Sequence, residues 1–246
     1  MLTYNFCMDD PAMDQQIEIS WAACPRWATF ESADLVDAVE QLSGRWAILL
    51  VDVQGSGRGG RRLASTLARE AREILAAGIS AETAVRAVHE HLYELRQGKV
   101  GASIHICEID PSAECATIVG LGGLAVALNV ESGWTVEALN GQAAGFDRLS
   151  GIESVRLPFT AGARLLLAND GVAHCAEDLT ALLERGNTAE IRLDARTVLD
   201  MAVERDSGRP RSDMAVAAIA RLEAESGPRV LEARILAPIR RFGSDL

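Results

Sequence analysis

Three aspartates adjoin apolar segments of this sequence, and their placement makes them candidates for binding a divalent cation. They are Asp52 after segment 47–51, Asp170 after segment 165–169, and Asp213 before segment 214–219. The first two segments run into their acid and the third runs away from its acid. Antiparallel strands would therefore bring the three carboxylates to one edge of a sheet. Hard cations such as Mg²⁺ and Mn²⁺ bind several oxygen ligands placed close together.

A fourth acid, Asp34, opens the apolar segment 35–39, which Ser43 and Gly44 join to the Asp52 segment. A β-hairpin centred near residue 43 would place Asp34 directly across from Asp52. Taken singly, an aspartate at a strand end is an ordinary turn or cap residue. The four acids together favour a cation site.

The glycine-rich stretch Gly55–Gly60 permits two interpretations. It follows an apolar strand and matches G-x-G-x-x-G, the pattern of a dinucleotide site. The acid-tipped strand expected about 20 residues later is missing, because 80–97 has helical periodicity, and Asp52 would repel a pyrophosphate. The same glycines suit a sharp turn at a cation site. Three arginines follow this turn, Arg58, Arg61 and Arg62; they are expected as solvated helix residues, or one of them, such as Arg58, as a ligand for a substrate phosphate.

Composition indicates one acidic globular domain spanning residues 1–246. The chain is 48% hydrophobic and carries a net charge of −11, which argues against a nucleic-acid partner. Its five cysteines are widely spaced, without a C-x-x-C pair, and predict neither a zinc site nor disulfides. No apolar stretch reaches the roughly 20 residues of a membrane span, so we expect a cytoplasmic protein without a membrane partner.

Hydrophobic periodicity predicts the elements that would position these acids. Residues alternate as in strands at 17–21, 104–106 and 124–130, whereas apolar stripes at 63–75 and 85–95 predict two helices. Two more helices fit 177–185 and 194–205, the latter with Asp194 as N-cap. Runs of strands followed by runs of helices predict a layered α+β domain rather than a βαβ repeat.

Three histidines have simpler assignments. His89 and His91 are two residues apart on a helix, so they point in different directions, and both are expected at the surface. His105, between Ile104 and Ile106, is expected to face a helix layer or solvent. None of them is predicted to bind metal.

The motifs resemble those of the metal-dependent protein serine/threonine phosphatases (PPM), in the bacterial branch that includes SpoIIE, RsbU and RsbX. Asp52–Gly57 is similar to the D-[VG]-x-G-x-G element of that family. Further elements occur in family order: Ser32–Asp34 for S/G-G-D, Gly120–Gly123 for G-x-G-N, Asn169–Val172 for S/T-D-G-[VI], and Ser212–Ala215 for D-D-[MAI]-T. The resemblance extends from about residue 17 to 222, with 227–246 as a C-terminal extension.

This resemblance implies a fold, a cofactor and a reaction. The fold is a β-sandwich flanked by helix pairs (α/β/β/α), and the cofactors are two Mn²⁺ or Mg²⁺ ions. The reaction is hydrolysis of phosphoserine or phosphothreonine on a protein by an activated water, without a covalent intermediate. The implied metal ligands are Asp34, Asp52, the carbonyl of Val53, Asp170, and either Asp213 or Ser212, with Asp52 and Asp170 essential for catalysis.

Two departures leave the activity open. Ser212 stands where the family has the first aspartate of D-D, and Ala215 stands where it has threonine. A neutral hydroxyl is a poorer ligand than a carboxylate for a hard cation. The first hypothesis is a working phosphatase of bacterial partner switching, in sigma-factor regulation, which acts on a phosphorylated anti-sigma antagonist. The second is a pseudophosphatase that binds such a partner without turnover.

Overall fold

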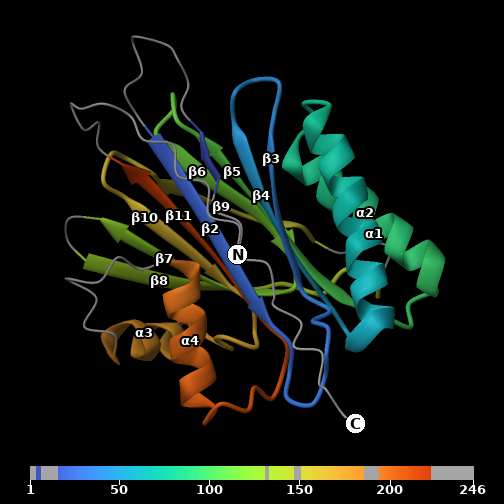
Figure 1. Ribbon diagram of the computed structural model, residues 1–246. Coiled ribbons are helices and arrows are strands. Elements are labelled where there is room, and N and C mark those ends of the chain that lie inside the picture. The colour runs from blue at the N-terminus through green and yellow to red at the C-terminus, as the bar shows by residue number, and fades with distance from the viewer. Residues whose placement is uncertain (1–3, 7–15, 131–132, 147–150, 186–193, 223–246) are drawn as a thin grey trace, which may run out of the picture.

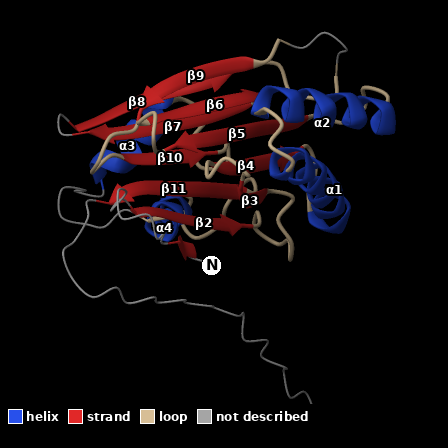
Figure 2. Ribbon diagram, turned by 90° about the horizontal axis from the view of Figure 1, so that it is seen from above, coloured by secondary structure: helices blue, strands red, loops and turns tan. Residues whose placement is uncertain are grey.

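The computed structural model describes residues 4–6, 16–130, 133–146, 151–185 and 194–222, which form two stacked antiparallel sheets with helices on both outer faces (Figures 1 and 2). One sheet has the order β1 (Tyr4–Phe6), β2 (Gln16–Cys24), β11 (Met214–Leu222), β10 (Arg164–Ala168), β7 (Gly123–Val130) and β8 (Gly133–Asn140). The other has the order β3 (Leu35–Glu40), β4 (Trp46–Val53), β5 (Ala102–Asp110), β6 (Cys115–Leu121) and β9 (Glu153–Pro158). The predicted α+β sandwich with flanking helices is confirmed.

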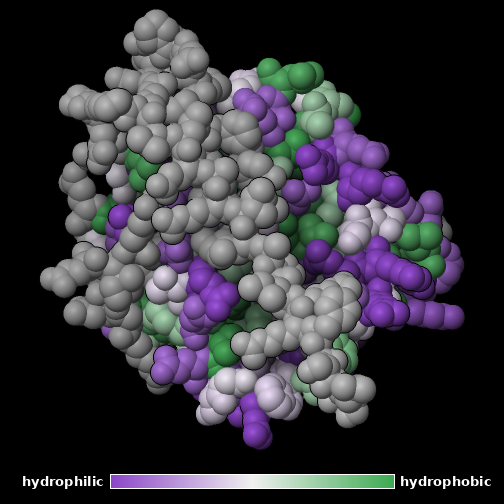
Figure 3. Space-filling model, in the orientation of Figure 1, coloured by the Kyte–Doolittle hydropathy of each residue, from purple (hydrophilic) through white to green (hydrophobic). Residues whose placement is uncertain are grey.

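Helices cover both outer faces of the sandwich. They are α1 (Gly57–Ala76) and α2 (Ala81–Arg96) on the β3–β4–β5 sheet, and α3 (Ala176–Arg185) and α4 (Ala195–Arg205) on the other. Asp194 caps α4 as predicted, because its side chain accepts a hydrogen bond from the Thr197 N–H at 2.8 Å. Hydrophilic side chains cover most of the visible surface of α1 and α2 (Figure 3). No described helix is long and apolar enough to cross a bilayer.

Strand β4 is apolar on both faces because it lies between two layers. Leu49 and Val51 pack against α1 and α2, whereas Ile48 and Leu50 pack between the sheets. Strand β10 repeats this pattern on the other side, with Leu166 facing α3 and α4. Burial on both faces fixes the register of each strand, because a slip of one residue would move every side chain to the other face.

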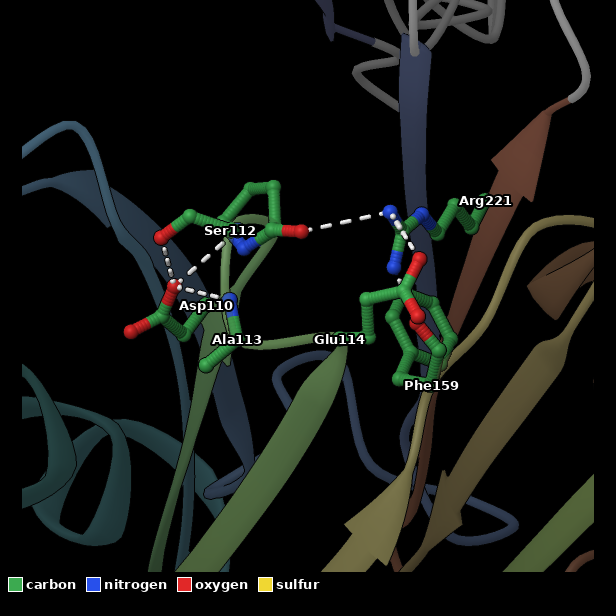
Figure 4. Close-up of polar contacts among 7 residues, drawn as sticks. Asp110, Ser112, Ala113, Glu114, Phe159 and Arg221 are labelled. Carbon is green, nitrogen blue, oxygen red and sulfur yellow. Dashed lines mark hydrogen bonds and ion pairs between the residues drawn. The ribbon is translucent and has the colours of Figure 1, made fainter.

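The buried side chain of Arg221 lies at the end of the sandwich where β11 finishes. Its guanidinium donates hydrogen bonds to the carbonyls of Phe159 and Pro111 at 2.5 and 3.2 Å, and it pairs with Glu114 at 3.1 Å (Figure 4). Beside it, Asp110 accepts three hydrogen bonds from Ser112 and Ala113 and so shapes the β5–β6 turn. The predicted acid Asp213 adjoins the start of β11, at the opposite end of the molecule. This network is therefore far from the predicted acids and is structural.

Two histidine predictions were wrong. His89 is 4% exposed, and its Nδ1 accepts a hydrogen bond from the Gly145 N–H at 3.1 Å. His105 is buried and pairs with Leu50, so it faces the opposite sheet, and burial lowers its pKa to about 4. His91 is half-buried and pairs with Glu70 of α1. The extension 227–246 and Cys7 lie outside the described residues; the four described cysteines are free, as expected.

Candidate functional site

Two antiparallel strand pairs, the β3–β4 hairpin and β10 with β11, bring the predicted acids to one end of the sandwich, the lower end in Figure 1. In the first, Leu35 of β3 lies opposite Val51 of β4, and the same register continued by one residue places Asp34 opposite Asp52. In the second, β10 runs toward this end and β11 starts from it. The antiparallel pairing is as predicted, but the prediction that the acids share the edge of one sheet is wrong: β4 lies in one sheet and β10 and β11 in the other, so each sheet supplies two acids.

Asn169, the residue after β10, joins the two sheets at this end. Its amide nitrogen lies 2.8 Å from Asp34 Oδ2 and 3.1 Å from Asp52 Oδ2, and its Oδ1 accepts a hydrogen bond from the Ala215 N–H at 2.9 Å. Asn169 is fully buried. Sequence reasoning included it only as part of a motif, although a polar residue directly after a buried apolar run was the available signal.

Asp34 and Asp52 form a buried carboxylate pair that favours a cation. Burial, followed by repulsion from Asp52 and a hydrogen bond with it, together raise the pKa of Asp34 to about 9. The pKa of Asp52 is raised to about 6 by burial and then by the charge of Asp170. Asp34 Oδ1 is buried and has no hydrogen-bond partner among the described residues. A bound cation would satisfy this oxygen and relieve the repulsion.

The two acids beside β10 and β11 differ in their surroundings. Asp170 is exposed, and its charge and a hydrogen bond both act on Asp52, so it adjoins the pair. Asp213 is buried, and its two carboxylate oxygens accept the backbone N–H groups of Arg26 at 2.7 Å and Ala33 at 2.6 Å. Asp213 thus fixes the loop that carries Asp34. Its half-buried neighbour Ser212 precedes β11.

The sequence shows which family this chain belongs to. The sequence matches the model of the family described as Stage II sporulation protein E (SpoIIE) over residues 43–222, which excludes Asp34. This protein belongs to that family. No curated protein matches the sequence directly. The residues 43–222 include Asp52, Asp170 and Asp213, so the family match covers most of the candidate site.

Solved structures show the same fold. The PP2C phosphatase domain of Bacillus subtilis SpoIIE with a regulatory fragment superposes with a TM-score of 0.72 at 15% identity, over 83% of this chain and 63% of that chain. The S. agalactiae serine/threonine phosphatase gives 0.68 at 14% identity, covering 84% and 100%. The catalytic domain of PstP, solved with two manganese ions, gives 0.67 at 14%, covering 85% and 100%. This SpoIIE-family chain thus spans less than two thirds of the SpoIIE structure.

The glycine-rich turn of this SpoIIE-family chain orients the backbone next to Asp52. Gly55 and Gly57 have φ of +130° and +68°, which side chains disfavour, so the sharp turn into α1 requires glycine. Val53 ends β4 opposite Ala102. The dinucleotide interpretation lacks its second strand, because α2 occupies 81–96.

Two arginines follow that turn with different contacts. Arg58 is exposed and lies 3.8 Å from Glu31, whereas the Arg61 guanidinium donates a hydrogen bond to the Asp34 carbonyl at 2.8 Å. Arg61, one of the three arginines considered from the sequence, therefore contacts the site backbone. The Arg58 side chain is exposed and its charged partner is Glu31.

The donor set is incomplete as a protein-only cage. In the described part of the chain, no three acidic, histidine or cysteine side chains are close enough to form a finished metal site. The buried pair Asp34 and Asp52, with Asp170 beside it, instead suits a cation that keeps several waters, as Mg²⁺ does.

We predict that the metal-free protein loses stability as pH rises from about 5 to 9. Asp34 is protonated in the native state up to its raised pKa of about 9 but ionises near 3.8 when unfolded. The native state therefore binds more protons in this window, so the free energy of unfolding falls with pH. The melting temperature measured in chelator should fall by at least about 2–4 °C across this window, equivalent to about 1 kcal/mol in the free energy of unfolding. A melting temperature that rises steadily over this window would contradict the prediction.

Proposed function

We propose that this chain is a metal-dependent protein serine/threonine phosphatase. The observation that carries the proposal is the buried pair of Asp34 and Asp52, joined by Asn169 and left with an unsatisfied oxygen, in a member of the SpoIIE family. The PP2C fold supports it. PstP, of the same fold, was solved with two manganese ions, and we propose two Mn²⁺ or Mg²⁺ ions here as well.

The chain's own residues would hold the cations and the phosphoryl group. Asp52, Asp34 and Asp170 would hold the ions through their carboxylates, and Val53 would add its carbonyl. When bound, the ions supply positive charge that offsets the phosphoryl oxygens and lowers the pKa of a water. Arg58 would contact the phosphate. Either Ser212 or Asp213 would complete the oxygen ligands of one of the ions.

The proposed substrate is a phosphorylated protein of bacterial partner switching, of the anti-sigma antagonist type, in the cytoplasm. Membership of the SpoIIE family supports this class, and the similar fold of a bacterial stressosome protein is consistent with it. We propose that the whole chain is one phosphatase domain with its core at 17–222.

A second candidate function is that of a pseudophosphatase that binds the phosphoprotein without turnover. One observation favours it: both oxygens of Asp213 are engaged by backbone N–H groups, while Ser212 has no carboxylate to offer. Phosphate release in manganese, from a phosphoprotein and from a small aryl phosphate, separates the two candidates. Turnover that chelator abolishes supports the phosphatase; binding of phosphoprotein without release supports the alternative.

We predict that manganese stabilises the purified protein. Binding to the native state alone raises the free energy of unfolding by about 2.7 kcal/mol at 100 times the dissociation constant. In a chain of this length that corresponds to a melting temperature about 5–10 °C higher. Melts with millimolar Mn²⁺, with Mg²⁺ and with chelator test this. An unchanged midpoint would contradict the metal site irrespective of any activity.

A further inference from the structure

Two aromatic side chains project into solvent from the loop 25–33, between β2 and β3. Trp27 is 60% exposed and Phe30 is fully exposed. Burying such a side chain would stabilise a fold by about 1.5–3 kcal/mol, and these two exposed side chains do not contribute that stabilisation. Exposed aromatic residues that do not support the core are typical of binding surfaces.

The loop is held in a defined conformation despite these exposed side chains. The Asp213 carboxylate accepts the N–H groups of Arg26 and Ala33, near either end of the loop. The Trp27 N–H donates a hydrogen bond to the Pro210 carbonyl at 2.8 Å, and the Arg209 guanidinium lies 5.3 Å from the centre of the Trp27 ring. The backbone is fixed from beneath, so Trp27 and Phe30 are presented outward.

The exposed charged side chains of this loop and of two segments that contact it are mostly basic, although the chain as a whole carries a charge of −11. The segments 25–33, 55–62 and 206–212 contain two acids, Glu31 and Asp206, and the following six exposed arginines: Arg26, Arg58, Arg61, Arg62, Arg209 and Arg211. Three of these arginines begin α1, whose first turn has no acid. The helix dipole disfavours cations there, so helix stability does not account for them.

We propose that the loop 25–33, with Arg209 and Arg211, docks a phosphoprotein whose phosphorylated residue is flanked by acidic and apolar side chains. The aromatic residues would take the apolar side chain and the arginines the acidic ones. Phe30 lies four residues from Asp34, at most about 14 Å along the chain, so a peptide of about four extended residues spans the distance. This proposal rests on the proposed function for its phosphorylated ligand.

The test uses synthetic phosphoserine peptides with the full chain and manganese. One peptide has aspartates and a leucine beside the phosphoserine, a second has lysines for the aspartates, and a third has serine for the leucine. We expect the first to have the highest kcat/KM. Phe30→Ala, Trp27→Ala and Arg209→Glu should each lower its kcat/KM about tenfold, through KM. Hydrolysis of a small aryl phosphate, which does not reach the loop, should change by less than about twofold.

Matched control variants lie away from the site. Leu42→Ala removes a side chain that is 86% exposed in the β3–β4 turn, and Arg69→Glu reverses an exposed charge on α1. Both should leave the peptide kinetics unchanged. Equal kcat/KM for the three peptides, or equal losses in the control variants, would overturn the docking proposal.

Binding of the same peptides, fluorescently labelled, separates this proposal from the proposed function. If no substrate is hydrolysed but the acidic, apolar peptide binds and Phe30→Ala weakens it about tenfold, the phosphatase fails and the docking surface stands. If aryl phosphate is hydrolysed but no peptide preference appears, the docking surface fails. A surface that instead joins two copies would show as a dimer dispersed by Phe30→Ala with unchanged peptide binding, which also overturns the proposal.

Discussion

Asp52→Asn and Asp170→Asn are each expected to lower manganese-dependent phosphate release by at least about 10³-fold while the protein stays folded. Asparagine keeps the shape of the side chain but removes the charge that would hold the cations. Phosphate release from a phosphoprotein and from an aryl phosphate measures the loss. Asp37→Asn is the matched control, since Asp37 lies on β3 near Asp34 but pairs with Arg72 at 3.2 Å.

Stability gives this prediction a second measurement. Asp52 raises the pKa of Asp34, so removing its charge relieves repulsion in the metal-free state. Asp52→Asn should therefore melt at an equal or higher temperature than the parent in chelator, yet gain less from manganese. Parental rates of hydrolysis in both variants would show that the catalytic assignment is wrong. A collapse of the melting temperature would instead assign Asp52 a structural role.

The β3–β4 hairpin at the site was predictable because local rules determine it. A short turn at Ser43 and Gly44 between two apolar strands fixes the register, and the register alone sets Asp34 opposite Asp52. The same holds for the apolar run before Asp170, since buried strands read as continuous hydrophobic segments. Apolar stripes likewise located α1 and α2, although α1 starts six residues before the first apolar residue of its stripe, Leu63.

Contacts between distant segments were not predictable in this way. Asp213 contacts Ala33, 180 residues earlier in the chain, and Asn169 contacts Asp34 across 135 residues. Each contact depends on how two sheets stack, which no local pattern encodes. His89 shows the same limit. Its position on the helix predicts a surface residue, but Gly145 from a distant loop covers it. The resemblance to a phosphatase family suggested the proposed function, which periodicity could not.

Asp213→Asn is expected to destabilise the protein with or without manganese. The Asp213 oxygens accept two buried backbone N–H groups, and an asparagine would turn its own N–H₂ toward one of these donors. An unsatisfied buried group costs about 1–3 kcal/mol, which corresponds to a melting temperature lower by several degrees. Displacement of the Asp34 loop should lower activity as well. Thermal melts in chelator and in manganese measure the effect.

Ser212→Asp tests the other position of the same motif. If Ser212 faces the site, the new carboxylate adds an anionic ligand and should lower the manganese concentration needed for activity by about tenfold. Ser43→Asp, which adds the same charge in the distant β3–β4 turn, is the control and should leave the manganese titration unchanged. A change in the manganese titration for Ser212→Asp but not for Ser43→Asp would show that position 212 faces the site. Should Asp213→Asn instead leave stability in chelator intact and remove only the gain from manganese, Asp213 is the ligand, and the pseudophosphatase hypothesis loses its main support.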